Sequence, residues 1–382
     1  MPKTARTSRS LQKKFEAEEA APPLPPFADD GETEDLHWKV KTAAVCELFC
    51  RGMTVREIRD RMLDEFGEPG RMSREEPYSL VSRAAKRGWL KFDPPRDVVS
   101  ESRIRDRYKW LKNAQVVHSA RIQPVALRGA EVLLNLVSKY AQRSRPRKTV
   151  RIGFAGGRSV GLLARLFAQL LTREKIQLPD KIVLQSLVAG FDPSDPATDP
   201  NTFFSFFLDD SSMRVQTEFV ALHAPPIVRE EDLDRLRRIV EIDEAYEAAK
   251  HVDIIVTSGS EWKDEHSPLK RSMTRERDVY DRLSRLGCVG DILWRPIGPA
   301  GPIEEPTDIR AMTLVELSDL PERIRSGTQV LLMLGPCGMC RRHKGSLLGA
   351  IMNHREQLVT HLVTDTRTAV TILPEEKESE ER

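Results

Sequence analysis

The hydrophobic and polar positions divide the chain into two parts of different kinds. Over residues 36–98, apolar residues recur at the three- and four-residue spacing of short amphipathic helices. Over residues 149–374, short apolar runs alternate with amphipathic helices. That alternation predicts an α/β domain with a mainly parallel sheet and helices on both faces. Residues 99–148 lie between the two parts and are predicted to be a helical connector.

Three helices are predicted in the first part. The first begins near Leu36 and ends before Gly52. Thr54 can cap the second helix, with Glu57 completing a capping box. Ser73 can cap the third helix, which we expect over residues 74–87. The side chains expected to face inward on the third helix are Tyr78, Val81 and Ala85, and a short strand is expected at Trp89–Phe92.

Seven strands are predicted in the second part. They are Val150–Ala155, Ile182–Val188, Glu218–Leu222, Asp253–Thr257, Gly290–Pro296, Gln329–Leu334 and Leu358–Val363. Because ligands of such sheets collect where parallel strands end, the loops after these strands are candidate binding segments.

The turn after the first of these strands carries the clearest chemical signal. Two glycines, Gly156 and Gly157, stand between the strand and a helix predicted over residues 159–173. Glycines let backbone N–H groups approach a ligand, and the positive end of the helix dipole favours an anion there. Arg158 and Ser159 add a guanidinium and a hydroxyl. The pattern predicts a phosphate site, although an ordinary packing turn has the same pattern.

Length and composition limit the number of domains and the cellular compartment. A length of 382 residues with 40% hydrophobic content suits two or three folded domains, and the net charge of +2 does not by itself indicate a nucleic-acid partner. No apolar run reaches the length of a membrane span or a signal peptide core, and five cysteines form no secreted-type framework. We therefore expect a cytoplasmic protein. Residues 1–35 and 375–382 are predicted to be disordered tails.

The helical part, residues 36–98, is predicted to be a helix-turn-helix domain. In such a domain the last helix enters the major groove of DNA. The side chains that we expect to face DNA are Ser79, Ser82, Arg83, Lys86 and Arg87. A small helical dimerisation or docking domain would have the same pattern.

The order of segments resembles the SorC family of bacterial transcription regulators. Six segments carry the resemblance, namely Val150–Val160, Val220–Pro225, Asp253–Gly259, Gly287–Ile292 (close to GAVGDI), Gly335–Lys344 and Leu362–Ala369 (close to LVTDE-x-TA). Family members join a helix-turn-helix to a domain that senses sugar phosphates and is similar in fold to sugar-phosphate isomerases. The resemblance therefore implies that residues 149–374 form a sugar-phosphate-binding effector domain.

Matching positions carry the effector site of the family over to this chain. The residues that the resemblance implies are Gly156, Gly157, Arg158, Ser159, Gly259, Asp291 and Lys344. Lys344 and Arg158 would contact phosphate, and Asp291 would accept hydrogen bonds from sugar hydroxyls. Lys344 could instead be a surface lysine, and Asp291 a structural turn residue.

The chain departs from the family pattern at several positions. Residues 65–73 lengthen the turn before the third helix, and Ser79–Ser82 only loosely matches the SR-x-x-V pattern. Arg158 stands where the family loop more often continues toward a threonine, and Thr366 replaces an acidic residue.

A Cys-x-x-Cys segment, Cys337–Cys340, precedes His343. A metal would need a fourth ligand, and a redox switch would need a thiolate of low pKa. The sequence favours small loop residues here, so no metal and no cofactor are expected.

The sequence as a whole predicts a transcription regulator rather than an enzyme. Its expected partners are a DNA operator, a phosphorylated sugar and further copies of the chain in a homo-oligomer. One alternative is an isomerase, deaminase or hydrolase that uses Asp291, Asp365 or His343 as acid or base. Another is a sugar-phosphate sensor without specific DNA binding.

Overall fold

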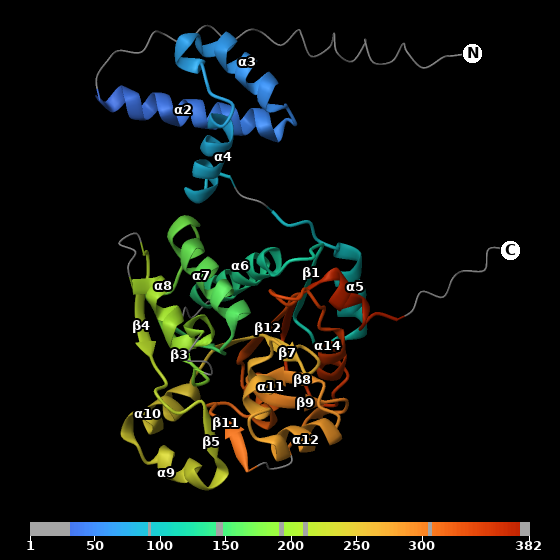
Figure 1. The fold of residues 1–382 in the computed structure, drawn as a ribbon. Coiled ribbons are helices and arrows are strands. Elements are labelled where there is room, and N and C mark those ends of the chain that lie inside the picture. Colours follow the sequence, from blue (N-terminus) through green and yellow to red (C-terminus); the bar gives the residue numbers. More distant parts are fainter. Residues whose placement is uncertain are drawn as a thin grey trace, which may run out of the picture. The chain divides into compact units, whose positions relative to one another are not determined.

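The computed structural model describes residues 31–90, 93–142, 148–190, 195–208, 213–304 and 308–374. It divides into two compact units, the first ending at Asp93 and the second beginning at Pro94 (Figure 1). The helices are α2 Gly31–Cys50, α3 Val55–Phe66, α4 Glu76–Lys86, α5 Val98–Arg107, α6 Ile122–Ala141, α7 Arg158–Arg173, α8 Ser205–Leu208, α9 Leu233–Arg237, α10 Val240–Ala249, α11 Pro268–Met273, α12 Arg277–Arg285, α13 Leu320–Arg325, α14 Gly345–Met352 and α15 Thr366–Val370.

The first unit is a bundle of α2, α3 and α4. The capping box predicted at α3 is present: Thr54 accepts from the Glu57 N–H, and the Glu57 carboxylate accepts from the Thr54 N–H. Apolar faces of the three helices meet in one core made of Val45, Leu48, Ile58, Met62, Met72 and Leu80. Hydrophobic burial of these faces holds the short helices together, because helices of this length are marginal alone.

Several details of the first unit differ from the sequence predictions. The α4 residues that face the core are Pro77, Leu80 and Ala84, whereas Tyr78 is 60% exposed. Of the three residues predicted to face inward, Val81 does pack against the core, whereas Ala85 is exposed and Tyr78 packs on the Phe49 ring. Trp89 and Leu90 form a bend rather than the predicted strand, whose other two residues lie outside the described part.

The predicted N-terminal tail also needs correction, since α2 already begins at Gly31. The rest of this predicted tail, residues 1–30, and the predicted tail 375–382 lie outside the described residues.

The second unit is built on a seven-stranded sheet in the order β1-β13-β12-β6-β2-β3-β4, in which every neighbouring pair is parallel. Its strands are β1 Asn113–Val117, β2 Thr149–Phe154, β3 Lys181–Ser186, β4 Gln216–Val220, β6 Ile254–Thr257, β12 Gln329–Leu334 and β13 His361–Asp365. A four-stranded antiparallel sheet has β7 Gly259–Glu261, β8 Gly290–Ile292, β9 Arg295–Gly298 and β10 Gly301–Pro302, and β5 Ile227–Arg229 pairs with β11 Ile309–Ala311. The predicted α/β fold is confirmed.

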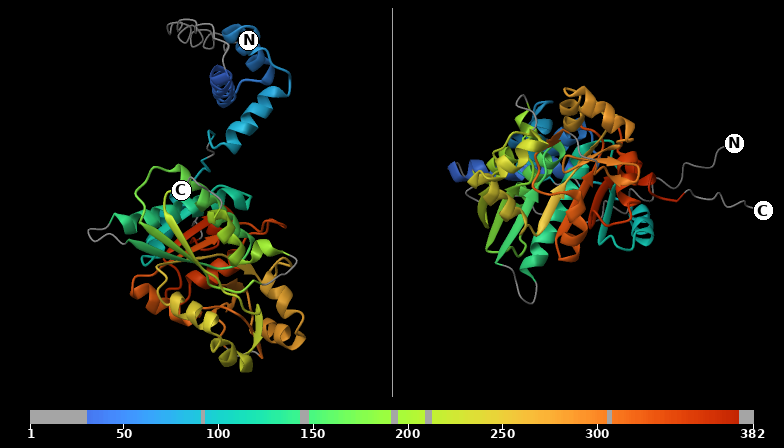
Figure 2. Two further views of the ribbon diagram at one scale, coloured as in Figure 1. Left: turned by 90° about the vertical axis from the view of Figure 1, so that its left-hand side faces the viewer. Right: turned by 90° about the horizontal axis from the view of Figure 1, so that it is seen from below.

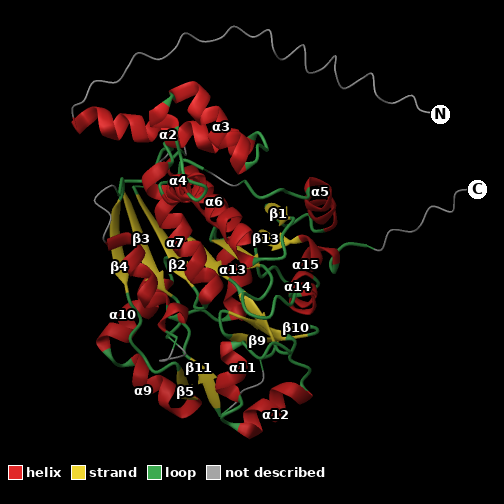
Figure 3. Cartoon of the chain, turned by 45° about the horizontal axis from the view of Figure 1, so that its top comes forward, coloured by secondary structure: helices red, strands yellow, loops and turns green. Residues whose placement is uncertain are grey.

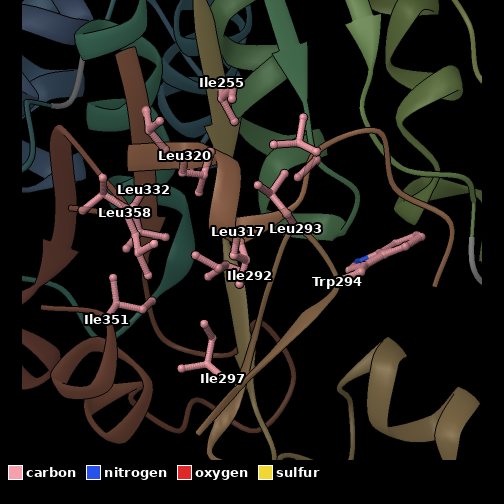
Figure 4. Close-up of a cluster of buried hydrophobic side chains, with 14 of the residues drawn as sticks. Ile255, Ile292, Leu293, Trp294, Ile297, Leu317, Leu320, Leu332, Ile351 and Leu358 are labelled. Atoms are coloured by element: carbon pink, nitrogen blue, oxygen red, sulfur yellow. The ribbon is translucent and has the colours of Figure 1, made fainter. Parts of the chain in front are cut away.

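Helices cover both faces of the large sheet, as the views in Figure 2 show. Along β12, Leu331 and Met333 join the core under α6 and α7, whereas Leu332 and Leu334 join the core on the other face. This alternation follows from the pleat of a strand, and it explains why a strand buried on both sides is apolar throughout. Figure 3 shows α6 and α7 side by side over the strands, and Figure 4 shows part of the core on the other face, which includes Leu332 of β12 and Ile292 of β8.

The predicted helical connector, residues 99–148, is part of the second unit. It contains β1, which pairs with β13 at the edge of the sheet, and α6, which packs on the sheet with α7. The boundary between the units accordingly falls at Asp93 and not at residue 98 or 148. A strand of only five residues between two helices gave too short an alternation to be recognised from sequence.

The strand predicted at Gly290–Pro296 is a hairpin, which corrects a second expectation. β8 and β9 pair antiparallel through the two-residue turn Leu293-Trp294. Both turn residues have positive φ, 50° and 58°. Such turns normally contain asparagine or glycine, so a leucine and a tryptophan there gave no turn signal in the sequence.

The order of the strands places a topological switch between β2 and β6. From β2 the chain runs outward to β3 and β4, and it then returns to β6, β12 and β13 on the other side. Loops that leave the carboxyl ends of β2 and β6 therefore diverge and open a crevice, which is where open α/β sheets bind ligands. In the described part of the chain, no helix combines the length and apolar character needed to cross a membrane.

Candidate functional site

A cavity of about 250 Å³ lies at the switch point between β2 and β6. Loops after β2, β6 and β12 contribute to its wall, together with the β8–β9 turn and the segment after β7. All seven residues predicted for the effector site line it, namely Gly156, Gly157, Arg158, Ser159, Gly259, Asp291 and Lys344. The structure thus brings together residues that lie up to almost 190 positions apart in the sequence.

The two glycines of the turn have different structural roles. A Cβ at Gly156 would lie 2.5 Å from Cζ2 of Trp294 and 2.9 Å from the carbonyl oxygen of Thr198. Gly157 has φ 107°, and nothing lies within 4 Å of the place of its missing Cβ. Gly156 is therefore required by packing, whereas Gly157 provides the backbone conformation and leaves the cavity side open.

The start of α7 faces the cavity with part of its backbone already paired. The Gly157 N–H donates to the Thr198 carbonyl at 2.8 Å. The next N–H groups, in the first helical turn from Arg158, have no acceptor within the helix. An anion at this end would bind those groups and not the Gly157 N–H on which the sequence prediction relied.

The Arg158 guanidinium forms an ion pair with Asp195, with 2.5 Å between Nη2 and Oδ2. Arg158 is about half exposed at its side chain, so solvent screens this pair and it contributes under about 1 kcal/mol. Arg158 can therefore exchange Asp195 for a bound anion at small cost. Asp195 belongs to a segment that the sequence analysis did not assign to the site.

Lys344 also lines the cavity and is buried, with only 6% of its surface exposed. Its Nζ donates to the Gly259 carbonyl at 2.6 Å. Burial lowers the pKa of Lys344, and the charges of Cys337 and Asp291 oppose that effect. The alternative of a surface lysine is therefore wrong.

Lys344 precedes α14, whose positive end already has an anionic partner. The Glu261 carboxylate accepts from the Ser346 N–H at 2.9 Å and from the Leu347 N–H. The positive charge of Lys344 and the positive end of the α14 dipole would repel each other, and the negative charge of Glu261 offsets this repulsion.

Asp291 is 4% exposed and accepts a hydrogen bond from the Ser260 hydroxyl. Burial raises the pKa of Asp291 to about 6, while the bond from Ser260 and the charge of Lys344 act in the opposite direction. The hydroxyl oxygen of Ser258, which also lines the cavity, is buried and has no hydrogen-bond partner among the described residues. Together these groups offer hydroxyl-binding positions beside the anion-binding ones.

Sequence reasoning missed the β8–β9 turn as part of the site. Leu293 and Trp294, both labelled in Figure 4, line the cavity, and the Trp294 ring packs directly on Gly156, where it occupies the place of a Cβ. Their positive φ angles store backbone strain, which folded proteins tend to keep at binding sites.

Four further polar side chains gather at the rim of the cavity. They are Asp264, His266, Cys337 and Cys340, whose donor atoms all lie within 4.8 Å of one another. Burial raises the pKa of the Cys337 thiol. The pKa of Asp264 is below its usual value, since burial, which raises it, is outweighed by hydrogen bonds from Cys337 and His266. His343, the neighbour suggested by the sequence, does not belong to the cluster.

The acid–base candidates of the enzyme alternative do not converge. Asp291 lines the cavity, but Asp365 and His343 are not among its lining residues. Asp365 instead caps α15, accepting from the N–H groups of Arg367 and Thr368 and from the Thr368 hydroxyl.

The residues predicted to face DNA lie on the exposed face of α4 in the first unit. Ser79, Ser82, Arg83, Lys86 and Arg87 are all exposed. Arg83 and Arg87 stack over the Trp38 ring, at 5.2 Å and 4.4 Å from its centroid. In the predicted long turn before α4, residues 68–70 form a 3-10 helix, which lies so close to α3 that a Cβ at Gly70 would overlap the Met62 carbonyl.

Comparison of the sequence with family models gave no match. Comparison with curated proteins gave no match either. Solved structures do match. The full-length sorbitol operon regulator SorC from Klebsiella pneumoniae aligns with 88% of this chain and 99% of its own, at 15% identity and a TM-score of 0.54.

Two further solved structures cover 72% of this chain and 99% of their own. A probable sor operon regulator from Shigella flexneri has 15% identity and a TM-score of 0.55. A DeoR family transcriptional regulator from Listeria monocytogenes has 20% identity and a TM-score of 0.51. The resemblance to SorC-type regulators is confirmed at the level of the fold, which this chain shares with them.

Proposed function

We propose that this protein is a transcription regulator that binds a phosphorylated sugar in the cavity between β2 and β6. The observation that carries the proposal is the convergence, on one cavity at the switch point of the sheet, of the seven residues that the resemblance implies, which come from four separate segments of the chain. The solved neighbour from Klebsiella pneumoniae regulates the sorbitol operon, which supports a sugar ligand. The cavity volume is slightly below the range of about 300–1,000 Å³ typical of small-molecule sites, which suits a small metabolite.

The arrangement of charge supports a phosphate at one end of the ligand. The first turn of α7 directs its N–H groups and the positive end of a 16-residue helix at the cavity. Arg158 and Lys344 add cations from two other directions, and Gly157 leaves the approach open. A dianionic phosphate would bind these groups with charge-assisted hydrogen bonds.

The sugar end of the ligand would contact polar side chains next to Lys344. Asp291, Ser258 and Ser260 line this part of the cavity, where Lys344 donates to the Gly259 carbonyl, and the Ser258 hydroxyl lacks a protein partner among the described residues. A sugar hydroxyl would satisfy it. Binding of the sugar would also cover the Trp294 ring, an apolar face of the kind on which sugar rings pack.

Thermal unfolding against a panel of phosphorylated sugars tests the ligand. A ligand that binds only the folded state raises the melting temperature with concentration. We expect a shift with a phosphorylated sugar, a smaller shift with the unphosphorylated counterpart, and an affinity about 10–100-fold weaker in Arg158→Ala. Arg165→Ala is the matched control, since Arg165 is exposed on the same helix and does not line the cavity. Equal shifts with and without phosphate would contradict the proposal.

We further propose that α4 binds DNA. Arg83 and Lys86 lie exposed in its last turn, and Arg87 follows as its C-cap residue. Phosphate contacts made by lysine weaken with salt, so Lys86→Ala should lower the affinity for all sequences and reduce the salt slope by about 1. Lys175→Ala, an exposed lysine of the second unit, is the control. Ligand binding without any DNA footprint would favour the sensor that acts through protein contacts.

A regulator of this kind requires paired DNA-reading units, so we propose a homo-oligomer. Sedimentation of the purified chain, with and without the sugar phosphate, measures its mass directly. A monomer at micromolar concentration in both conditions would contradict this part of the proposal.

A further inference from the structure

The cluster at the cavity rim joins two segments that are distant in sequence. Asp264 and His266 follow β7, whereas Cys337 and Cys340 follow β12. His266 precedes Cys337 by 71 positions, and Asp264 precedes Cys340 by 76. The tertiary fold alone places one carboxylate, one imidazole and two thiols so that their donor atoms lie within 4.8 Å of one another.

The separations between these donor atoms match a small coordination sphere. Nδ1 of His266 is 2.9 Å from Oδ1 of Asp264, Sγ of Cys340 is 3.6 Å from the same oxygen, and Sγ of Cys337 is 4.0 Å from Nδ1. Zinc bonds of about 2.0–2.3 Å in a tetrahedron place donor atoms about 3.3–3.8 Å apart. All six separations lie within 4.8 Å, so shifts of about 1 Å or less would let the four atoms surround one ion.

The backbone holds both sulfurs in position. The N–H groups of Met339 and Cys340 hydrogen-bond to the Cys337 sulfur. The Cys337 N–H donates to the Arg342 carbonyl, and the Arg341 N–H donates to the Cys337 carbonyl, both at 2.9 Å. Arg341 adopts φ 59°, which is uncommon for a residue other than glycine. A turn closed in this way orients two cysteines toward one point and supplies hydrogen bonds that support thiolate ligands.

The other segment is equally constrained. The Asp264 N–H donates to the Glu261 carbonyl at 3.0 Å, and the Ser267 N–H donates to the Asp264 carbonyl at 3.1 Å. The His266 N–H donates to the Asp264 carboxylate at 2.9 Å. Both side chains are therefore presented by a tight turn between β7 and α11 and not by a long open loop.

We propose that Asp264, His266, Cys337 and Cys340 bind one zinc ion. Two thiolates and an imidazole select zinc over calcium or magnesium, which prefer oxygen ligands. Four protein ligands complete a tetrahedron and leave no open position, so the zinc is structural and not catalytic. It ties the β7–α11 turn to the loop after β12 and thereby stabilises one wall of the cavity.

Metal content of the full-length protein purified under reducing conditions tests the proposal. We expect one zinc per chain in the wild type, and cobalt substitution should give the absorption of a tetrahedral site with thiolate charge-transfer bands. Cys340→Ser and Asp264→Asn should each weaken zinc binding at least tenfold, since ligand loss removes a coordination bond.

Two control variants keep the outcome specific. His343→Ala changes the exposed histidine beside the Cys-x-x-Cys segment, and Cys50→Ser changes an exposed cysteine of the first unit. Both should keep one zinc per chain. Circular dichroism of each variant distinguishes loss of a ligand from loss of the fold, and Asp264→Asn keeps the size of the side chain.

Two results would overturn the proposal. The first is reduced wild type that contains no zinc and gives no cobalt thiolate bands when the metal is added to the folded protein. The second is a Cys337–Cys340 disulfide, found by peptide mapping without reductant, in a chain that still binds no metal after reduction, which would assign the pair to redox chemistry.

Discussion

Close packing around Gly156, in the turn after β2, leaves no room for a side chain at this position. The Trp294 ring and the Thr198 carbonyl fill the space that a Cβ at Gly156 would need, and both come from segments distant in sequence. A glycine of this kind is indistinguishable, in the sequence, from one that serves a ligand directly. The phosphate-loop pattern was thus right about the position of the turn, whereas the packing reason for its first glycine came only from the structure.

Gly156→Ala should destabilise the second unit by about 1–3 kcal/mol, because the new methyl group overpacks the turn. Gly349→Ala is a matched control, since Gly349 lies in α14 and nothing lies within 4 Å of its missing Cβ. That change should stabilise by about 0.5–1 kcal/mol, because alanine loses less conformational entropy in a helix. Denaturant unfolding measures both, and equal effects of the two substitutions would contradict the packing argument.

Asp291 should make the stability of the folded state depend on pH. Its pKa is raised to about 6 in the folded protein, so the folded state binds the proton more tightly than the unfolded state. Stability due to this group is therefore present at low pH and is lost as pH rises toward 6.

Asp291→Asn removes that titration while keeping a hydrogen-bonding side chain for Ser260. The variant should gain stability relative to the wild type at about pH 7.5 and lose that advantage at about pH 4.5. Denaturant midpoints at the two pH values measure the change. A difference that is the same at both would show that ionised Asp291 is fully compensated by Lys344.

At the scale of elements, local sequence signals were reliable where they act within one helix. The capping box of α3 was recognisable because Thr54 and Glu57 are only three positions apart. The β8–β9 hairpin was not recognisable, because its turn residues are held in place by burial in a core and not by their own preferences. The inward face of α4 was likewise decided by tertiary packing, in which Leu80 joins the core formed with α2 and α3.

Thr54→Ala should weaken α3 by about 0.5–2 kcal/mol through loss of the cap. Amide hydrogen exchange of the whole chain measures this locally: exchange should accelerate in α3 and remain unchanged in α7 of the second unit. The exposed Ser79→Ala on α4 is the control, since that serine is not a cap. Uniform acceleration in both units would mean that the units unfold together.

At the scale of the whole molecule, β1 and α6 belong to the α/β unit. α6 contributes 13 buried residues, and β1 covers the edge of β13. A chain of residues 94–382 should therefore fold alone, whereas a chain of residues 149–382 should expose the β13 edge and an apolar face of the sheet and aggregate.

Expression of both fragments tests this division. The longer one should be monodisperse, unfold cooperatively and keep the sugar-phosphate-dependent rise in melting temperature. If the shorter one does the same, then β1 and α6 are accessory to the sheet, and the connector predicted from sequence was the better description.

The sequence by itself determined the α/β class of the second unit, the turn at Gly156 and Gly157 and the capping of α3, and the resemblance indicated seven of the residues that line the cavity. The class, the turn and the cap depend on spacings of a few residues, which hydrophobic periodicity and glycine positions record directly. The tertiary structure alone decided the strand order, and with it the switch point that opens the cavity. It also decided the strained turn at Leu293 and the meeting of Asp264 with Cys340. Contacts between distant segments depend on how strands pair and cores pack, and no local pattern encodes that choice.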